Sequence, residues 1–150
     1  MDNLARSLTN ELLDLSSAID LIGSAAAARL GINQTDLICL NLLVRNGPMS
    51  PGQLAAALGL TTAAISAMAT RLEAGGYARR EIDPKDRRRV LMHASPAGAR
   101  QAFGLFDDFY EATTELYASS SEQELRALVD LVARFRQVIT DHAARIRSGA

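Results

Sequence analysis

Four cations fall within five residues of the chain: Lys85, Arg87, Arg88 and Arg89, with Asp86 between them. Guanidinium and ammonium groups at this density can bind phosphate oxygens, and the negative potential of a DNA minor groove attracts them. Asp86 could hold one of the arginines in place through a charge-assisted hydrogen bond. A charged turn in solvent is the commoner source of such a cluster, so the elements around it must decide between the two interpretations.

The cations belong to the tip of a predicted β-hairpin whose strands cover residues 77–82 and 89–94. A predicted helix over residues 61–74 comes directly before this hairpin, and a short helix over residues 51–58 precedes it. Two helices joined by so tight a turn indicate a helix-turn-helix, and a basic hairpin directly after them is typical of a wing. The order of elements therefore favours a nucleic-acid contact over a solvated turn.

The second helix of the pair has an apolar face and a polar face. The apolar residues follow the spacing i, i+3, i+4 and i+7 and are predicted to face the core: Ile65, Met68, Ala69 and Leu72. At 100° per residue the opposite arc points outward, and it carries Ala63, Ser66, Ala67, Thr70 and Arg71. Small and polar side chains would allow this helix to lie deep in a major groove.

The distribution of charge supports the same interpretation, although the net charge of −1 does not. From Arg45 to Arg100 nine basic residues stand against four acidic ones, a balance of +5. The rest of the chain holds seven basic and thirteen acidic residues, a balance of −6. A basic middle segment suits a polyanionic partner.

Two helices are predicted before the basic segment. The first ends near Gly31 and carries leucine and isoleucine at intervals of three and four. The second is capped by Asn33 and ends at residues 46–48. Its predicted buried stripe comprises Leu37, Leu40, Leu43 and Val44.

Two more helices are predicted after the hairpin. One runs from Pro96 to about Ala118, and the last begins at a capping box of Ser121 and Glu124 and is apolar along one face nearly to its end. Apolar faces on both terminal helices fit an intertwined homodimer with a two-fold axis. The predicted fold class is mainly α with a small β-hairpin wing: one domain, with a winged helix-turn-helix lobe over residues 33–96 and dimerisation helices over residues 1–32 and 97–148.

The segment from Tyr77 to Leu91, followed by Ser95-Pro96-Ala97-Gly98, resembles the wing signature of the MarR family of transcription regulators. The similarity continues backward through residues 71–76 and covers about residues 47–100. The resemblance implies a homodimer that binds double-stranded DNA, in many members a repressor released by a small-molecule ligand. Two winged lobes would reach half-sites about 10 base pairs apart, which predicts a pseudo-palindromic operator.

The resemblance also implies a set of DNA-binding residues. The residues it implies are Thr61, Thr62, Ser66, Thr70, Arg71, Lys85, Arg87 and Arg88. Ala63 and Ala67 from the outward arc of the helix and Arg89 from the cation cluster complete the predicted DNA-binding set. Many relatives have a longer polar or basic residue where this chain has Ala67. We therefore expect specificity to come from thymine-methyl contacts, Thr and Ser hydrogen bonds and shape readout by the wing, rather than from a bidentate arginine–guanine pair.

A ligand pocket is less well indicated. In relatives it lies where the dimerisation helices meet the winged lobe, so Phe106 and Tyr110 could border one. Packing in a core explains the aromatic residues of this segment equally well.

The sequence carries weaker signals for functions other than DNA binding. Cys39 lies in an apolar helix without a neighbouring Lys, Arg or His, so a buried inert thiol is preferred to a cysteine-based redox sensor. A winged-helix protein-interaction module without DNA binding stays open. There is no motif for an enzyme, no metal-ligand spacing around His93 or His142, and no cofactor is expected beyond a small-molecule effector. Without a signal peptide or an apolar run near ~20 residues, the chain is expected to be cytoplasmic and not membrane-bound.

Overall fold

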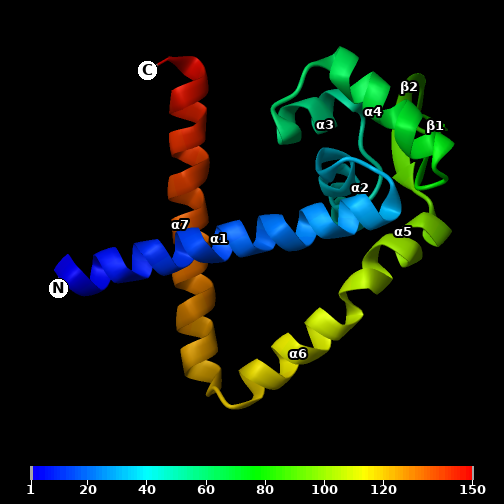
Figure 1. Ribbon diagram of the computed structural model, residues 1–150. Coiled ribbons are helices and arrows are strands. Elements are labelled where there is room, and N and C mark those ends of the chain that lie inside the picture. Colours follow the sequence, from blue (N-terminus) through cyan, green and yellow to red (C-terminus); the bar gives the residue numbers. More distant parts are fainter. Residues whose placement is uncertain (1, 150) are drawn as a thin grey trace. The chain divides into compact units, whose positions relative to one another are not determined.

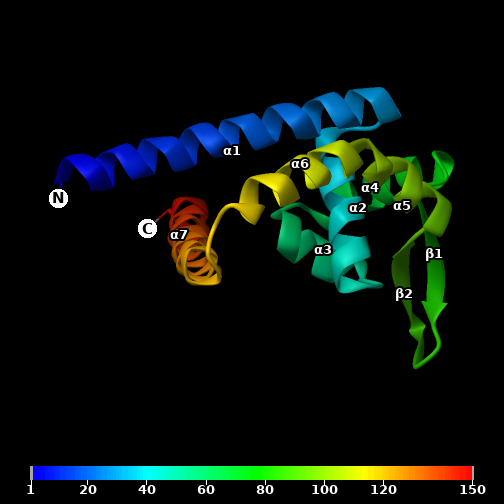
Figure 2. The ribbon, with the colours of Figure 1, turned by 90° about the horizontal axis from the view of Figure 1, so that it is seen from below.

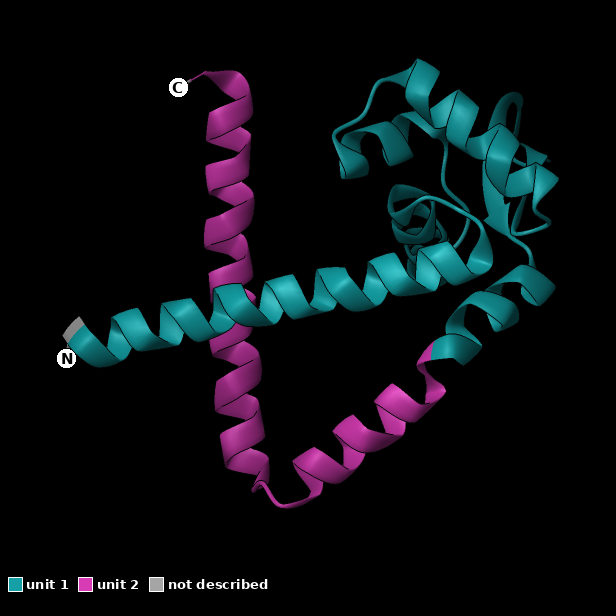
Figure 3. Ribbon diagram, viewed as in Figure 1, with its two compact units in different colours: residues 1–105 teal, residues 106–150 magenta. Residues whose placement is uncertain are grey.

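The computed structural model describes residues 2–149, which form helices and one antiparallel hairpin (Figure 1). The elements are α1 Asp2–Leu30, α2 Gln34–Asn46, α3 Pro51–Leu58, α4 Thr62–Ala74, β1 Ala78–Asp83, β2 Asp86–Ala94, α5 Pro96–Phe103, the 3₁₀ helix η1 Gly104–Phe106, α6 Asp107–Ala118 and α7 Glu122–Ser148. The predicted class, mainly α with a β-hairpin wing, is confirmed. The chain divides into two compact units, residues 1–105 and 106–150 (Figure 3).

Local caps begin the helices of the first unit. Ser50 accepts a hydrogen bond from the N–H of Gln53 (3.3 Å), and the Gln53 side chain accepts one from the N–H of Ser50 (2.8 Å), so a capping box begins α3. Thr61 accepts from the N–H of Ala64 at 3.2 Å. Asn33 occupies the N-cap of α2, but its side chain makes no capping hydrogen bond, so its predicted capping role is wrong.

The core of the first unit contains the stripes that helical spacing predicts. The apolar face of α4 is buried, and α3 contributes Leu54. The buried α4 residues are Ile65, Met68, Ala69 and Leu72. In α2 the leucines of the predicted stripe are buried, but Val44, in the last turn of the helix, is 45% exposed. The prediction was wrong for Val44.

The hairpin β1–β2, here called the wing, pairs Ala78 with Ala94 at its base and Asp83 with Asp86 at its tip. Its turn has only two residues, because Asp83 Oδ1 accepts a hydrogen bond from the N–H of Lys85 (2.8 Å) and closes it. The second strand therefore begins three residues before the predicted start at residue 89, and Arg87 and Arg88 lie on the strand instead of in the turn. The wing extends beyond α4 and α5 (Figure 2).

Tyr77 joins the base of the wing to the helices around it. Its hydroxyl donates a hydrogen bond to the carbonyl oxygen of Leu30 at the end of α1 (3.0 Å), and its own carbonyl accepts one from the N–H of Ser95 (2.8 Å). Gly98 in α5 lies against it, so that a Cβ at position 98 would be 2.5 Å from Tyr77 Cα. Tyr77, directly before β1, is thus held in place by α1 and α5.

The single helix predicted from Pro96 to about Ala118 is wrong. α5 ends at Phe103, and the 3₁₀ helix separates it from α6. Gly104 is the C-cap residue of α5 and donates its N–H to the carbonyl of Arg100. Glycine is a poor helix former, so a tighter turn replaces the α-helix at this position.

Several long helices have apolar side chains that no other element of their own unit covers. On α1 these side chains are Leu4, Leu8, Leu13, Leu15, Ile19, Leu21 and Ile22. On α6 and α7 they are Phe109, Tyr110, Leu116, Tyr117, Leu128, Val129, Val132, Val138, Ile139 and Ile146. Within residues 2–149 no single helix is both long and apolar enough to cross a membrane; α1 with α2 and α3 with α4 pass that test only as bent pairs, by length and composition alone.

The contact between Gly98 and Tyr77 yields a stability prediction. Gly98→Ala should lower the free energy of unfolding by about 1 to 3 kcal/mol, because the new methyl group overlaps backbone atoms that cannot move aside cheaply. Gly52→Ala is the matched control, since a Cβ there meets nothing within 4 Å. Urea denaturation measures both variants, and equal stability of the two would contradict the packing described for α5.

Candidate nucleic-acid interface

The predicted outward arc of α4 is exposed. Six residues of the predicted DNA-binding set lie on it or at its N-cap with exposed side chains: Thr61, Thr62, Ala63, Ser66, Ala67 and Thr70. The helix thus presents methyl groups and hydroxyls without a long side chain in its first two turns. Such a surface can approach the floor of a groove closely.

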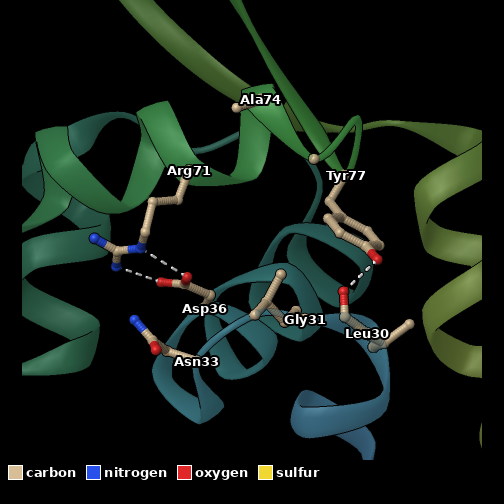
Figure 4. A pocket seen from close by; sticks show the side chains of 9 residues that line it. Leu30, Gly31, Asn33, Asp36, Arg71, Ala74 and Tyr77 are labelled. Carbon is tan, nitrogen blue, oxygen red and sulfur yellow. Dashed lines mark hydrogen bonds and ion pairs between the residues drawn. The ribbon is translucent and has the colours of Figure 1, made fainter.

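Arg71, the last residue of the predicted α4 set, is bound to Asp36 (Figure 4). Its Nε and Nη2 donate to the two carboxylate oxygens at 3.0 and 2.7 Å. The Asp36 side chain is 0% exposed and the Arg71 side chain 47%. The hydrogen bond to Asp36, followed by its negative charge, raises the pKa of Arg71. This bidentate pair anchors α4 to the first turn of α2, a role that the sequence analysis did not identify.

A cavity of about 420 Å³ lies beside this ion pair (Figure 4). Its lining residues are Leu30, Gly31, Ile32, Asn33, Asp36, Arg71, Ala74, Gly75 and Tyr77. A second, mainly apolar groove of about 550 Å³ runs along α7 and includes Tyr117. Phe106 and Tyr110 line neither of these cavities, and their contact with an effector stays a prediction.

Arg80 on β1 also binds α4, and the sequence analysis missed it. Its Nη1 pairs with Glu73 Oε2 at 2.6 Å, and the second oxygen of Glu73 accepts the Arg80 N–H at 2.9 Å. Its Nη2 donates to the carbonyl of Ser66 (3.0 Å) and to the hydroxyl of Thr70 (3.3 Å). The seven-residue separation of Glu73 and Arg80 across a glycine turn is the only sequence signal for this pair, and it is a weak one.

The cations of the wing differ in whether a carboxylate neutralises them. Arg89 lies 4.0 Å from Asp83, at the limit of an ion pair. The prediction that Asp86 holds one of the arginine guanidinium groups is wrong. Its side chain instead accepts a hydrogen bond from the backbone N–H of Arg88 at 3.0 Å, at the beginning of β2. Within residues 2–149, no ion pair involves the side chains of Lys85, Arg87 or Arg88, all of them exposed.

Farther toward the base of the wing the charge is compensated. Arg79 donates to Glu81 on the same strand, and this hydrogen bond is the main reason why the pKa of Glu81 is lowered. His93 Nε2 lies 3.4 Å from the other oxygen of Glu81. The positive potential of the wing is therefore concentrated at its outer end.

Cys39 is fully buried in α2, as predicted. Burial, with a smaller contribution from the negative charge of Asp36, raises the pKa of its thiol to about 11. The thiolate needed for reaction with peroxide is disfavoured at neutral pH. Among the described residues no three His, Cys, Asp or Glu side chains gather in a way that could hold a metal ion.

A helix-turn-helix followed at once by a hairpin with free cations at its end defines a winged helix-turn-helix protein. Residues 30–89 match the family model described as MarR family. The chain is 35% identical to the HTH-type transcriptional regulator YcgE of Bacillus subtilis over 127 residues, 85% of this chain and 82% of that protein. It belongs to the MarR family of DNA-binding transcription regulators.

Solved structures agree on the fold. A MarR family protein from Bacillus stearothermophilus superposes with a TM-score of 0.72 at 16% identity, over 93% of this chain and 98% of that one. A mutant MepR from S. aureus, bound to an oligodeoxyribonucleotide, gives a TM-score of 0.60 at 18% identity, over 88% of this chain and 97% of that one. The sequence-based assignment to the MarR family is confirmed.

The ion pair between α2 and α4 predicts an asymmetric response to substitution. Arg71→Met should lower the free energy of unfolding by about 3 kcal/mol, because it leaves the Asp36 carboxylate buried without its partner. Asp36→Asn should cost less, about 1 to 2 kcal/mol, since the half-exposed guanidinium can be hydrated.

Urea denaturation measures both variants against Glu122→Gln, which breaks an ion pair on α7 whose two side chains are 79% exposed. That control should change stability by less than about 0.5 kcal/mol. An Asp36→Asn variant less stable than Arg71→Met would contradict the anchoring role assigned to the buried carboxylate.

Proposed function

We propose that this chain is a sequence-specific repressor that acts in the cytoplasm as a homodimer on a pseudo-palindromic operator and responds to a small-molecule ligand. The observation that carries the proposal is the uncompensated charge of Lys85, Arg87 and Arg88 at the outer end of a wing next to α4. Cations without intramolecular partners can replace the counterions along a DNA backbone, and no ion pair within the protein has to be broken first.

In this proposal α4 enters the major groove. Ala63 and Ala67 can contact thymine methyl groups, and the hydroxyls of Thr62 and Ser66 can bond base edges. Arg71 is half exposed while bound to Asp36, so its remaining donors can reach a phosphate. The wing would then supply shape readout by placing its cations along the minor groove.

A second copy of the chain is proposed to cover the exposed apolar side chains of α1, α6 and α7. Large contiguous apolar surface on long helices is unfavourable in water and is typical of an interface between subunits. Residues 1–32 and 97–148 would form this interface, with the apolar groove along α7 included. A ligand would act by binding more tightly to a dimer in which the spacing of the two α4 helices no longer matches that of the half-sites.

The test is to pass a library of genomic DNA fragments over the purified protein near physiological salt and to sequence what is retained. A two-fold symmetric motif is expected. Arg88→Ala should weaken binding to the most strongly retained fragment about tenfold and should lower the salt dependence by about one ion per chain.

Arg126→Ala is the matched control, because it removes the same charge from an exposed position on α7 and should leave DNA affinity unchanged. If no motif is enriched and Arg88→Ala behaves like Arg126→Ala, the chain is a winged-helix protein-interaction module instead.

The redox-sensing alternative predicts a reactive thiol, and the structure leads us to expect the opposite. At pH 8 the folded chain should react with a disulfide reagent at least about a hundredfold more slowly than the chain in urea, because raising the pKa of Cys39 from 9.0 to about 11 lowers the thiolate fraction by that factor. The release of a coloured thiol measures both rates. Equal rates would favour a cysteine-based sensor.

A further inference from the structure

We infer that Arg80 and Glu73 form a clamp that sets the angle of the wing against α4, and that both are positioning residues for DNA binding. The pair joins the two elements proposed to contact DNA, and neither residue belongs to the predicted DNA-binding set. The effect on DNA rests on the proposed function, whereas the mechanical role does not.

The clamp uses both the side chain and the backbone of Arg80. One carboxylate oxygen of Glu73 holds the Arg80 guanidinium and the other holds the Arg80 N–H. Met92 is the residue paired with Arg80 in the hairpin, but its backbone hydrogen bonds go to Met49 instead. The Met92 N–H donates to the Met49 carbonyl (2.8 Å), and the Met92 carbonyl accepts from the Met49 N–H (3.1 Å), which leaves the Arg80 N–H available. Arg80 and Met92 are therefore a pair without mutual hydrogen bonds, and the Arg80 N–H points to the outer edge of β1.

The guanidinium then reaches farther along α4. Its Nη2 donates to the carbonyl of Ser66, almost two turns before Glu73, and to the hydroxyl of Thr70, less than one turn before it. Thr70 donates its own proton to Ser66 O at 3.1 Å, so its hydroxyl is fixed in direction as well. Four interactions from one arginine thus span α4 from Ser66 to Glu73.

Arg80 lies at the point where the wing leaves the lobe. On the tip side of it Ile82 and Val90 are exposed, and no hydrogen bond or ion pair within residues 2–149 joins the part of the wing beyond Arg80 to α4. Lys85 is five residues farther, about 16 Å at about 3.3 Å per residue, so a rotation of about 10° at the clamp moves the tip by about 3 Å. A displacement of that size separates a cation from its phosphate.

The chain provides a matched control on the same strand. Arg79 and Glu81 form an ion pair of the same chemistry, but both belong to β1, so their pair does not connect the wing to α4. Arg80→Lys and Glu73→Gln are therefore compared with Arg79→Lys and Glu81→Gln. All four positions are partly exposed, and thermal unfolding should give similar midpoints for the four variants.

The first measurement needs no DNA. Nitroxide labels are attached to a Cys39→Ala chain that carries Ala63→Cys and Lys85→Cys. Pulsed electron paramagnetic resonance then measures the distance between α4 and the wing tip, and an excess of unlabelled chain suppresses distances between subunits. The distance distribution should broaden or shift in Arg80→Lys and Glu73→Gln and should stay unchanged in both controls. Distributions that match the controls would overturn the clamp.

The second measurement uses unlabelled chains and the most strongly retained genomic fragment. Arg80→Lys and Glu73→Gln should weaken binding about tenfold and lower the salt dependence by about one to two ions per chain, because wing phosphate contacts are lost. If the distance measurement shows that the wing has moved while DNA affinity is unchanged, Arg80 and Glu73 are not positioning residues for DNA binding. If the parent chain retains no fragment, the proposed function fails, while the distance measurement still decides whether the clamp exists.

Discussion

The arrangement of the winged lobe depends on one buried carboxylate. Asp36 has no exposed surface, and a charge in that position is tolerable only if a cation and hydrogen-bond donors meet it. Arg71 meets it from α4 with two parallel hydrogen bonds, so the rotation of α4 about its axis is fixed relative to α2. That rotation decides which side chains of α4 point outward. Ala63 and Ala67 lie in the same i, i+4 row of α4 as Arg71, so the rotation at which Arg71 reaches Asp36 is also the one that leaves these two small residues exposed.

Arginines in the lobe divide into two groups by the same logic. Arg71, Arg79 and Arg80 are held by carboxylates and serve the geometry of the protein. Arg87 and Arg88 have no such partner among the described residues and keep their charge for another molecule. The +5 balance of the middle segment is therefore unevenly available. Little free positive charge lies near α4, and most of it lies at the end of the wing.

Features set by neighbouring residues were predictable from the sequence. Helical spacing was sufficient to predict the extent of α3 and α4 and the buried face of α4, because this periodicity is set by residues close together in the chain. The Arg71–Asp36 pair was not predictable, since 35 positions separate the two residues and an arginine on an outward arc has no local sign of its partner. The break at Gly104 was underestimated because the aromatic residues on both sides of it continue a helical spacing.

The register of β2 determines how the wing presents its charge. The strands pair regularly from Ala78–Ala94 to Ile82–Val90, and the next pair is Asp83 with Asp86, so that Arg87, Arg88 and Arg89 form a bulge on β2. A bulge bends its strand, increases the local twist and re-aims side chains. The outer end of the wing is therefore a bent row of cations and not a flat ribbon, and such a shape can follow the curved wall of a groove.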